Sequence, residues 1–138
     1  MMESRGTLAV EKRAKGYNCA QAVVCTYCDL VGMDEQTLFR LTEGLGGGMG
    51  TGTGTCGAVV GACILAGLVN SSGNLQEPDS KAATAKLSRG IMCRFQQRSG
   101  AVTCKELKGI ETGKMLRSCP DCIRDAAEFA EEILFQKQ

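Results

Sequence analysis

We predict an all-α fold for this sequence, a compact, bundle-like domain of several helices, from three observations. Apolar residues recur at helical spacing, as they do at Leu87, Ile91 and Phe95. The alternation of apolar and polar residues that marks half-buried strands is nearly missing. Glycines and small polar residues separate the helical stretches, as helix stop and start signals do. Because the length is that of one domain, we expect residues 1–138 to form a single redox-active helical domain.

These signals place the helical segments in chain order. Gly16, Gly32 and Gly100 fit helix ends, because glycine adopts the left-handed conformation found there without steric strain. The last segment carries its apolar residues on one stripe, which is typical of a helix packed on a core. The expected helices span residues 4–15, 19–31, 34–45, 56–69, 78–98 and 118–136, with a short turn at 103–109.

A long Gly-rich loop leads into what we expect to be a buried central helix. No charged residue occurs from Gly44 to Gln76. The apolar stretch Cys56 to Val69 is too short to cross a bilayer, so we predict a buried helix and no transmembrane segment. Gly57 and Gly61 begin a series of small residues spaced by four, which would let another helix pack closely against this one.

The same loop contains a G-x-G-x-x-G pattern, from Gly52 to Gly57. Dinucleotide binding by this pattern requires a preceding strand within a parallel sheet. The preceding segment instead has a helical pattern, and no G-K-[ST] motif follows. Two interpretations remain: a structural connection, or a loop whose glycines let backbone approach Cys56 closely.

Composition excludes several classes of function. The net charge of +1 predicts neither nucleic-acid binding nor attachment to a membrane surface. The absence of histidine removes the usual general base, the usual haem ligand and most catalytic zinc sites. The charged N-terminal segment does not resemble a signal peptide, so we expect a cytoplasmic protein. Nine cysteines in a reducing compartment indicate metal binding or redox chemistry rather than a disulfide framework.

Four of the nine cysteines follow a residue that favours helix N-caps. A thiol at the first turn of a helix lies near free N–H groups and the positive end of the helix dipole, which stabilise a thiolate. The other five fall inside helical patterns, where buried packing is the favoured interpretation; they are Cys25, Cys28, Cys63, Cys93 and Cys122. The four capped pairs are Asn18-Cys19, Thr55-Cys56, Thr103-Cys104 and Ser118-Cys119.

The order and spacing of the cysteine motifs resemble the redox-active family named C_GCAxxG_C_C, over residues 16–134. Cys119 fits the last family cysteine better than Cys122 does. The chain is also similar to the cysteine-rich helical part of split-Soret cytochromes c, where such cysteines are implicated in holding an iron–sulfur cluster. It has no C-x-x-C-H motif, so the resemblance does not extend to haem. The motifs that carry the resemblance are "YNCAQAV", "GGGMGTGTGTCGAVVGA", "TCKELKG" and "CPDCIRDAAE".

Three kinds of chemistry remain open for these thiols. Cys19, Cys56, Cys104 and Cys119 could together hold an iron–sulfur cluster for electron transfer or redox sensing, with Gly57 and Gly61 beside it. Zinc would accept the same four sulfurs. Without a metal, the C-x-x-C pair Cys119 and Cys122 could carry out thiol–disulfide exchange, helped by the neighbouring Arg117. We prefer the cluster.

The sequence says less about partners. A redox partner is implied by the chemistry but not identified, and the many small residues are compatible with a homodimer. A basic series without an acidic residue lies on the helix expected over 78–98. A solvated face is the favoured interpretation, and an anionic partner the alternative. The series consists of Lys81, Lys86, Arg89, Arg94 and Arg98.

Overall fold

The computed structural model describes residues 4–135, and it confirms the all-α prediction. This part of the chain contains eight α-helices and no strand; one isolated β-bridge joins Thr55 and Thr103. The helices are α1 (Gly6–Ala14), α2 (Cys19–Thr26), α3 (Cys28–Val31), α4 (Glu35–Thr42), α5 (Gly57–Asn70), α6 (Lys81–Ser99), α7 (Cys104–Lys108) and α8 (Cys119–Ala130).

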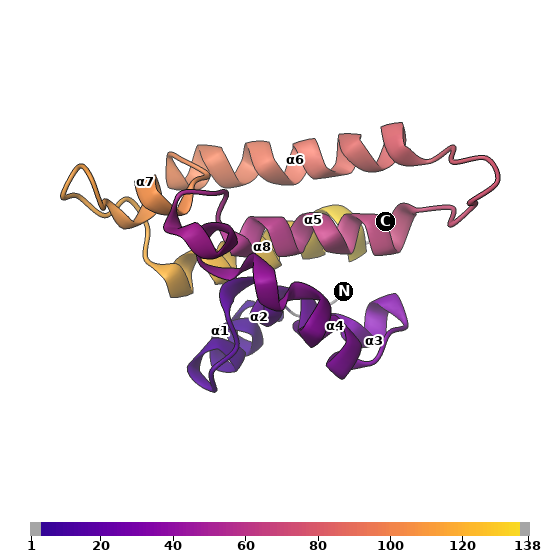
Figure 1. The fold of residues 1–138 in the computed structure, drawn as a ribbon, viewed down its shortest axis with the longest axis horizontal. Coiled ribbons are helices and arrows are strands. Elements are labelled where there is room, and N and C mark those ends of the chain that lie inside the picture. Colours follow the sequence, from indigo (N-terminus) through magenta and orange to yellow (C-terminus); the bar gives the residue numbers. More distant parts are fainter. Residues whose placement is uncertain (1–3, 136–138) are drawn as a thin grey trace.

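The central helix of the fold is α5, as Figure 1 shows. It packs against α2 on one side, α6 on the other, and α8 along its length. Its side chains Ala58, Val59, Ala62 and Leu65 are completely buried. The Gly-rich segment before α5 forms irregular turns, and the starts of α5, α7 and α8 lie at the same end of the molecule, on the left in Figure 1.

The contact between α2 and α5 depends on Gly61. A Cβ atom at this position would lie 3.0 Å from the Ala20 carbonyl oxygen and 3.2 Å from a methyl carbon of Val24. The backbones of the two helices can therefore approach closely only because residue 61 has no side chain. Gly61 thus serves helix packing, as its place in the series of small residues predicted.

Two expected helices are shorter than predicted because tertiary contacts interrupt them. The helix expected over 19–31 breaks at Tyr27, whose hydroxyl donates hydrogen bonds to Glu131 (2.8 Å) and to the Ala127 carbonyl (3.1 Å). The helix expected over 78–98 begins at Lys81 instead. Asp79 belongs to the preceding loop, where it accepts a hydrogen bond from Ser72.

The remaining boundaries agree more closely. The first helix, expected over 4–15, is α1, and the turn at 103–109 contains α7. The segment expected over 34–45 is α4 followed by a 3-10 turn, Glu43–Leu45. The last helix, expected over 118–136, is α8 continued by a π-helical turn, Glu131–Phe135, and its final residue lies outside the described residues.

The start of α8 is fixed by a buried carboxylate. Asp125 is only 2% exposed and accepts hydrogen bonds from Arg117, at 2.9 and 3.1 Å, and from Arg98, at 3.2 Å. A buried carboxylate is stable only when cations or N–H donors offset its charge. These ion pairs therefore tie the residue before the Ser118 cap to the end of α6.

Part of the basic series on α6 is neutralised within the molecule. Arg94 forms an ion pair with Glu132 (2.7 Å), and Arg98 forms the pair with Asp125. Both guanidinium groups also lie over the ring of Phe129. None of the helices within residues 4–135 combines the length and apolar character that a bilayer-spanning segment needs.

Replacing Gly61 by leucine tests the close packing of α2 and α5. We expect Gly61→Leu to lower the free energy of unfolding by about 1–3 kcal/mol, because the side chain overpacks the contact. Gly67→Leu is the matched control: it lies in the same helix with no atom within 4 Å of its Cβ position. Equal losses for both variants in urea unfolding would contradict the packing role of Gly61.

Candidate functional site

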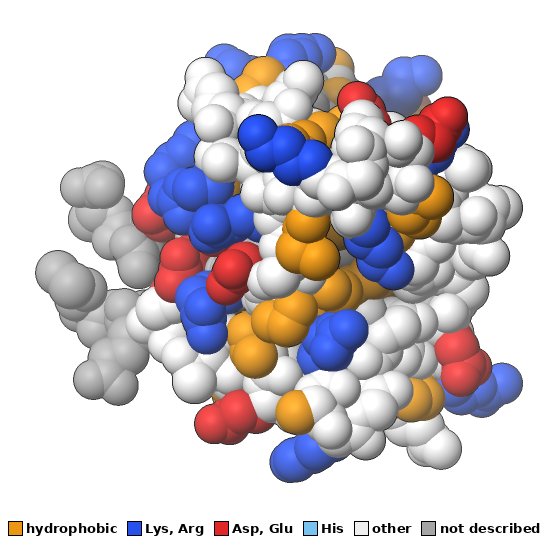
Figure 2. All heavy atoms as spheres, turned by 90° about the vertical axis from the view of Figure 1, so that its left-hand side faces the viewer, with side chains coloured by type: hydrophobic (Ala, Val, Ile, Leu, Met, Phe, Trp, Pro, Cys, Tyr) orange, Lys and Arg blue, Asp and Glu red, His pale blue; other side chains and the backbone are white. Residues whose placement is uncertain are grey.

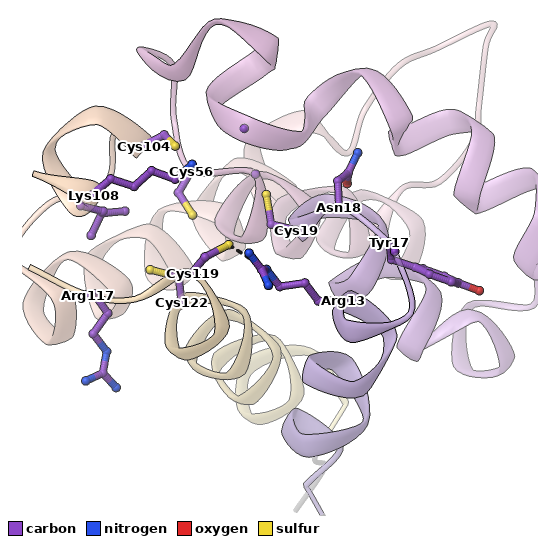
Figure 3. Close-up of a pocket in the computed structure, with 14 residues that line it drawn as sticks. Arg13, Tyr17, Asn18, Cys19, Cys56, Cys104, Lys108, Arg117, Cys119 and Cys122 are labelled. Atoms are coloured by element: carbon purple, nitrogen blue, oxygen red, sulfur yellow. Dashed lines mark hydrogen bonds between the residues drawn. The ribbon is translucent and has the colours of Figure 1, made fainter. Parts of the chain in front are cut away.

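Five cysteines line one cavity of about 370 Å³ at the end of the molecule where α5, α7 and α8 begin. Figure 3 shows the sulfurs of Cys19, Cys56 and Cys119 directed toward a common space. We call this cavity the thiol pocket. Its cysteines come from four separate segments of the chain, and they are Cys19, Cys56, Cys104, Cys119 and Cys122.

The structure confirms three of the four predicted helix starts. Cys19, Cys104 and Cys119 are the first residues of α2, α7 and α8. Their caps are complete. Asn18 accepts from the Gln21 N–H while the Gln21 side chain accepts from the Asn18 N–H. The hydroxyl groups preceding the other two cysteines accept from backbone N–H groups in the same way. Each cap orients the following cysteine toward the pocket.

The fourth predicted cap is wrong. Cys56 itself occupies the N-cap position of α5, and the Thr55 side chain makes no capping bond. Thr55 is instead held in the β-bridge with Thr103. In this bridge the Cys56 N–H donates to the Val102 carbonyl (2.7 Å) and the Cys104 N–H donates to the Gly54 carbonyl (2.9 Å). The bridge therefore brings two distant cysteines to the same side of the pocket.

Glycines make room for two of the thiols. A Cβ atom on Gly57 would overlap with the sulfur of Cys19, and one on Gly48 would lie 2.8 Å from the Cys104 Cβ. Gly48 also has a φ of +64°, which favours glycine. The glycines therefore make close approach possible at Cys19 and Cys104, whereas the sequence predicted it around Cys56. Gly61 lies further along α5, against α2, and is not among the residues that line the pocket.

The dinucleotide interpretation of the Gly-rich loop has no structural support. Helix α4 and a 3-10 turn precede the loop, and residues 4–135 contain no sheet that could carry a nucleotide-binding crossover. The small residues from Gly52 to Gly57 instead adopt turns that end in the β-bridge. Their contribution is to the thiol pocket.

The pocket is electropositive. Three cations line it, Arg13, Lys108 and Arg117, and no aspartate or glutamate does. The Arg13 Nε donates a hydrogen bond to the sulfur of Cys119 at 3.3 Å, marked by the dashed line in Figure 3. Such an arrangement stabilises negative charge on sulfur.

Cys19 and Cys119 line the same pocket, and their thiols shift each other's pKa. The hydrogen bond from Cys19, together with that from Arg13 and the charge of Lys108, lowers the pKa of Cys119 to about 5. The same hydrogen bond and the burial of Cys19 raise the pKa of the Cys19 thiol. The pair therefore consists of a Cys119 thiolate and a Cys19 thiol that donates to it.

Cys56 and Cys122 form a second pair. The hydrogen bond from Cys122, and then the N–H groups of Ala58 and Val59 in the first turn of α5, lower the pKa of Cys56. The interaction with Cys56 and burial raise the pKa of Cys122. Thus the pKa of each cysteine of the C-x-x-C motif is shifted by a different thiol, that of Cys119 by Cys19 and that of Cys122 by Cys56.

The thiols surround the cavity rather than meeting at one point. Among residues 4–135, no three Cys, Asp or Glu side chains are grouped closely enough to hold a single metal ion. A zinc ion would need its sulfur donors at about 2.3 Å from the metal. The structure therefore brings the predicted ligands into one pocket without forming a closed ion site.

The remaining cysteines are not in the pocket lining. Cys25 is buried in α2, as the packing interpretation predicted, whereas Cys28 and Cys63 are half-buried. Cys93 is exposed on α6, so that interpretation is wrong for it. Cys122 is buried, as that interpretation predicted, and it also lines the pocket beside Cys119, its partner in the C-x-x-C pair considered for thiol–disulfide exchange.

The fold and the site describe an all-helical protein with a pocket lined by five cysteines. Residues 17–133 match the family described as "Putative redox-active protein (C_GCAxxG_C_C)". This match spans most of the chain, so the protein belongs to that family, and the resemblance inferred from the motifs is confirmed. No curated protein and no solved structure matches the chain significantly.

The low pKa of Cys119 predicts a thiolate in mildly acidic solution. In the metal-free protein, ultraviolet thiolate absorbance should show one group titrating near pH 5. Unfolded thiols titrate near pH 8.5. The unfolded chain therefore binds the extra proton between these values, and the contribution of Cys119 to stability rises with pH through this window. This contribution of Cys119 to stability is lost as the pH falls through 5.

Two variants identify the titrating group. Cys119→Ser should remove the acidic transition, and Arg13→Gln should move it to higher pH because the thiolate loses a charged donor. Lys86→Gln, in the part of α6 before its last turns, is the control and should leave the transition unchanged. Persistence of the transition in Cys119→Ser would show that another thiol is the ionised one.

Proposed function

We propose that this protein is a small one-electron redox protein that holds an iron–sulfur cluster in the thiol pocket. The observation that carries the proposal is the convergence of five cysteines, from four separate segments, on one cavity without carboxylates. Electron transfer is the main role proposed, and redox sensing would use the same site. All nine cysteines are free, which supports a reducing location such as the cytoplasm.

The donor set fits such a cluster. Four cysteine thiolates complete the ligand shell of a [2Fe–2S] or [4Fe–4S] centre. We assign this role to Cys19, Cys56, Cys104 and Cys119. A cluster places iron and sulfide atoms between its ligands, so its cysteines line a cavity, whereas the ligands of one zinc ion converge on a point. The cavity of about 370 Å³ therefore favours the cluster over zinc.

The chain's own residues would prepare the pocket for this group. When bound, the cluster would supply the capacity to gain and lose one electron. Arg13 and Lys108 would offset its negative charge, and the N–H groups at the start of α5 would donate to sulfur. Gly57 leaves the space that the Cys19 sulfur needs. Burial of three of the four proposed ligands would exclude water and thereby tune the potential.

Metal and sulfide analysis of anaerobically purified protein tests the proposal. We expect iron and acid-labile sulfide in nearly equal amounts, with little zinc, and visible absorption that dithionite bleaches. Cys56→Ser should lose most of the iron, because it removes one of the four proposed ligands, a buried thiol of the pocket whose pKa is lowered. Cys93→Ser is the matched control, since this exposed cysteine lies on α6 outside the pocket lining.

The alternatives give different results. If the protein contains zinc but no sulfide, and Cys56→Ser loses this zinc, the pocket is a structural zinc site. That result would overturn electron transfer by these residues. If the protein contains neither iron nor zinc after anaerobic reconstitution with iron and sulfide, the thiols themselves are the remaining redox groups. Comparison of Cys122→Ser with the other pocket variants shows whether the fifth thiol is a ligand.

Thiol–disulfide exchange is a second candidate, favoured by the hydrogen-bonded pair of Cys19 and Cys119. The more exposed Cys119 thiolate would attack a low-molecular-weight disulfide such as oxidised glutathione and release one glutathione thiolate. Cys19 would then lose its proton to solvent, attack the Cys119 sulfur and release the second glutathione. The products are one protein disulfide and two reduced glutathione molecules.

The crossed pairing predicts which disulfide forms first. In metal-free protein treated with oxidised glutathione, peptide mapping should recover Cys19 linked to Cys119 before Cys119 linked to Cys122. The reason is that the hydrogen bond already holds the first pair together. Dominance of the Cys119–Cys122 disulfide would restore the C-x-x-C motif as the centre of this chemistry.

A further inference from the structure

We infer that the mouth of the thiol pocket is a docking surface for an electron-transfer protein with an acidic face. The mouth contains Arg13 and Lys108, and the segment that follows α7 in the chain exposes the apolar side chains of Ile110, Met115 and Leu116. The inference rests on the proposed redox function and adds the place and chemistry of the partner.

The positive charge of the mouth is not neutralised within the molecule. Arg117 is paired with the buried Asp125, but Arg13 and Lys108 have no ion pair with a carboxylate of residues 4–135. The nearby acidic side chains already have partners: Glu111 pairs with Lys105, Asp121 pairs with Arg124, and Glu106 accepts a hydrogen bond from Thr103.

The segment that follows Lys108 in the chain exposes apolar side chains. Ile110 is 62% exposed, Met115 59% and Leu116 45%. The Leu116 N–H donates to the carbonyl of Leu107 (2.9 Å), and Leu107 lines the pocket, so the exposed segment is anchored to the pocket wall. Figure 2 shows apolar side chains on this end of the molecule with Lys and Arg side chains around them. Apolar contact at the centre and charges around it are typical of protein interfaces.

The redox site is most accessible at this surface. Cys19, Cys56 and Cys104 are less than 9% exposed, whereas Cys119 is half-buried. Arg13 therefore connects the two functions, because it belongs to the mouth and bonds directly to the Cys119 sulfur. A partner with carboxylates facing Arg13 and Lys108 would be steered to this point, since complementary potentials accelerate encounter. The small net charge of +1 gives no such steering by itself.

Charged electron acceptors test the surface. After reduction by dithionite, the protein would pass one electron to hexacyanoferrate(III), giving hexacyanoferrate(II), or one to hexaammineruthenium(III), giving the ruthenium(II) complex. We expect the rate with the anionic acceptor to fall with rising salt, and the rate with the cationic acceptor to rise. Lys108→Glu should lower the ratio of the two rates about tenfold in 0.1 M salt.

The control is Lys86→Glu, the same change of charge on α6. It should leave the ratio within about twofold of the original value, because screening weakens charges beyond about 10 Å in 0.1 M salt. An equal fall in both variants would show an effect of total charge and would overturn the docking surface. A ratio that Lys108→Glu leaves unchanged would also overturn the docking surface.

A second readout uses no metal, so failure of the cluster proposal remains distinguishable. In metal-free Cys93→Ser protein, the thiolate of Cys119 attacks an aromatic disulfide and releases one aromatic thiolate. We measure the ratio of the rate with anionic dithiobis-nitrobenzoate to the rate with neutral dithiodipyridine. This ratio should be higher in this protein than in the same protein with Lys108→Glu. A fall in this ratio supports the surface even where iron and sulfide are absent. An unchanged ratio overturns the surface even where a cluster is present.

Discussion

Negative charge on buried sulfur is the constraint on which the thiol pocket depends. A thiolate inside a protein is unstable unless donors or cations offset its charge. For Cys119 this is done by the Cys19 thiol and Arg13, and for Cys56 by the Cys122 thiol and the first N–H groups of α5. The start of α5 is therefore part of the chemistry, because it positions Cys56 and its N–H groups help to lower the pKa of that thiol.

Contacts outside the pocket hold its cysteine-bearing segments in place. The buried Asp125 pairs with Arg117 and Arg98, which fixes the chain before α8 against the end of α6. The bridge between Thr55 and Thr103 fixes Cys56 relative to Cys104. Since the Arg98–Asp125 pair and the Thr55–Thr103 bridge join segments distant in sequence, the five thiols line one pocket only in the folded protein. The pocket is thus a product of tertiary structure, and no single motif contains it.

Local signals predicted what local physics determines. The caps at Asn18 and Ser118 need only neighbouring residues, so the sequence indicated those helix starts correctly. Thr55 has the same type of side chain for capping, but the bridge with Thr103 holds its backbone extended. No sequence pattern near residue 55 predicts that contact. The break at Tyr27 likewise results from hydrogen bonds to α8, a hundred residues away. The crossed thiol pairs could not be predicted, because they depend on how α8 packs between α2 and α5.

The position of Cys119 links the redox site with its surroundings. It is the pocket cysteine that is both hydrogen-bonded to a surface cation and paired with a buried thiol. A redox group that is completely buried would be protected but slow to exchange electrons, and an exposed one would react without discrimination. One partly exposed sulfur beside Arg13 would satisfy both needs of the proposed redox site, since charge would select the reaction partner while the other thiols remain shielded. Arg13 contributes both to the positive charge of the mouth, together with Lys108, and to the low pKa of Cys119, together with the Cys19 thiol.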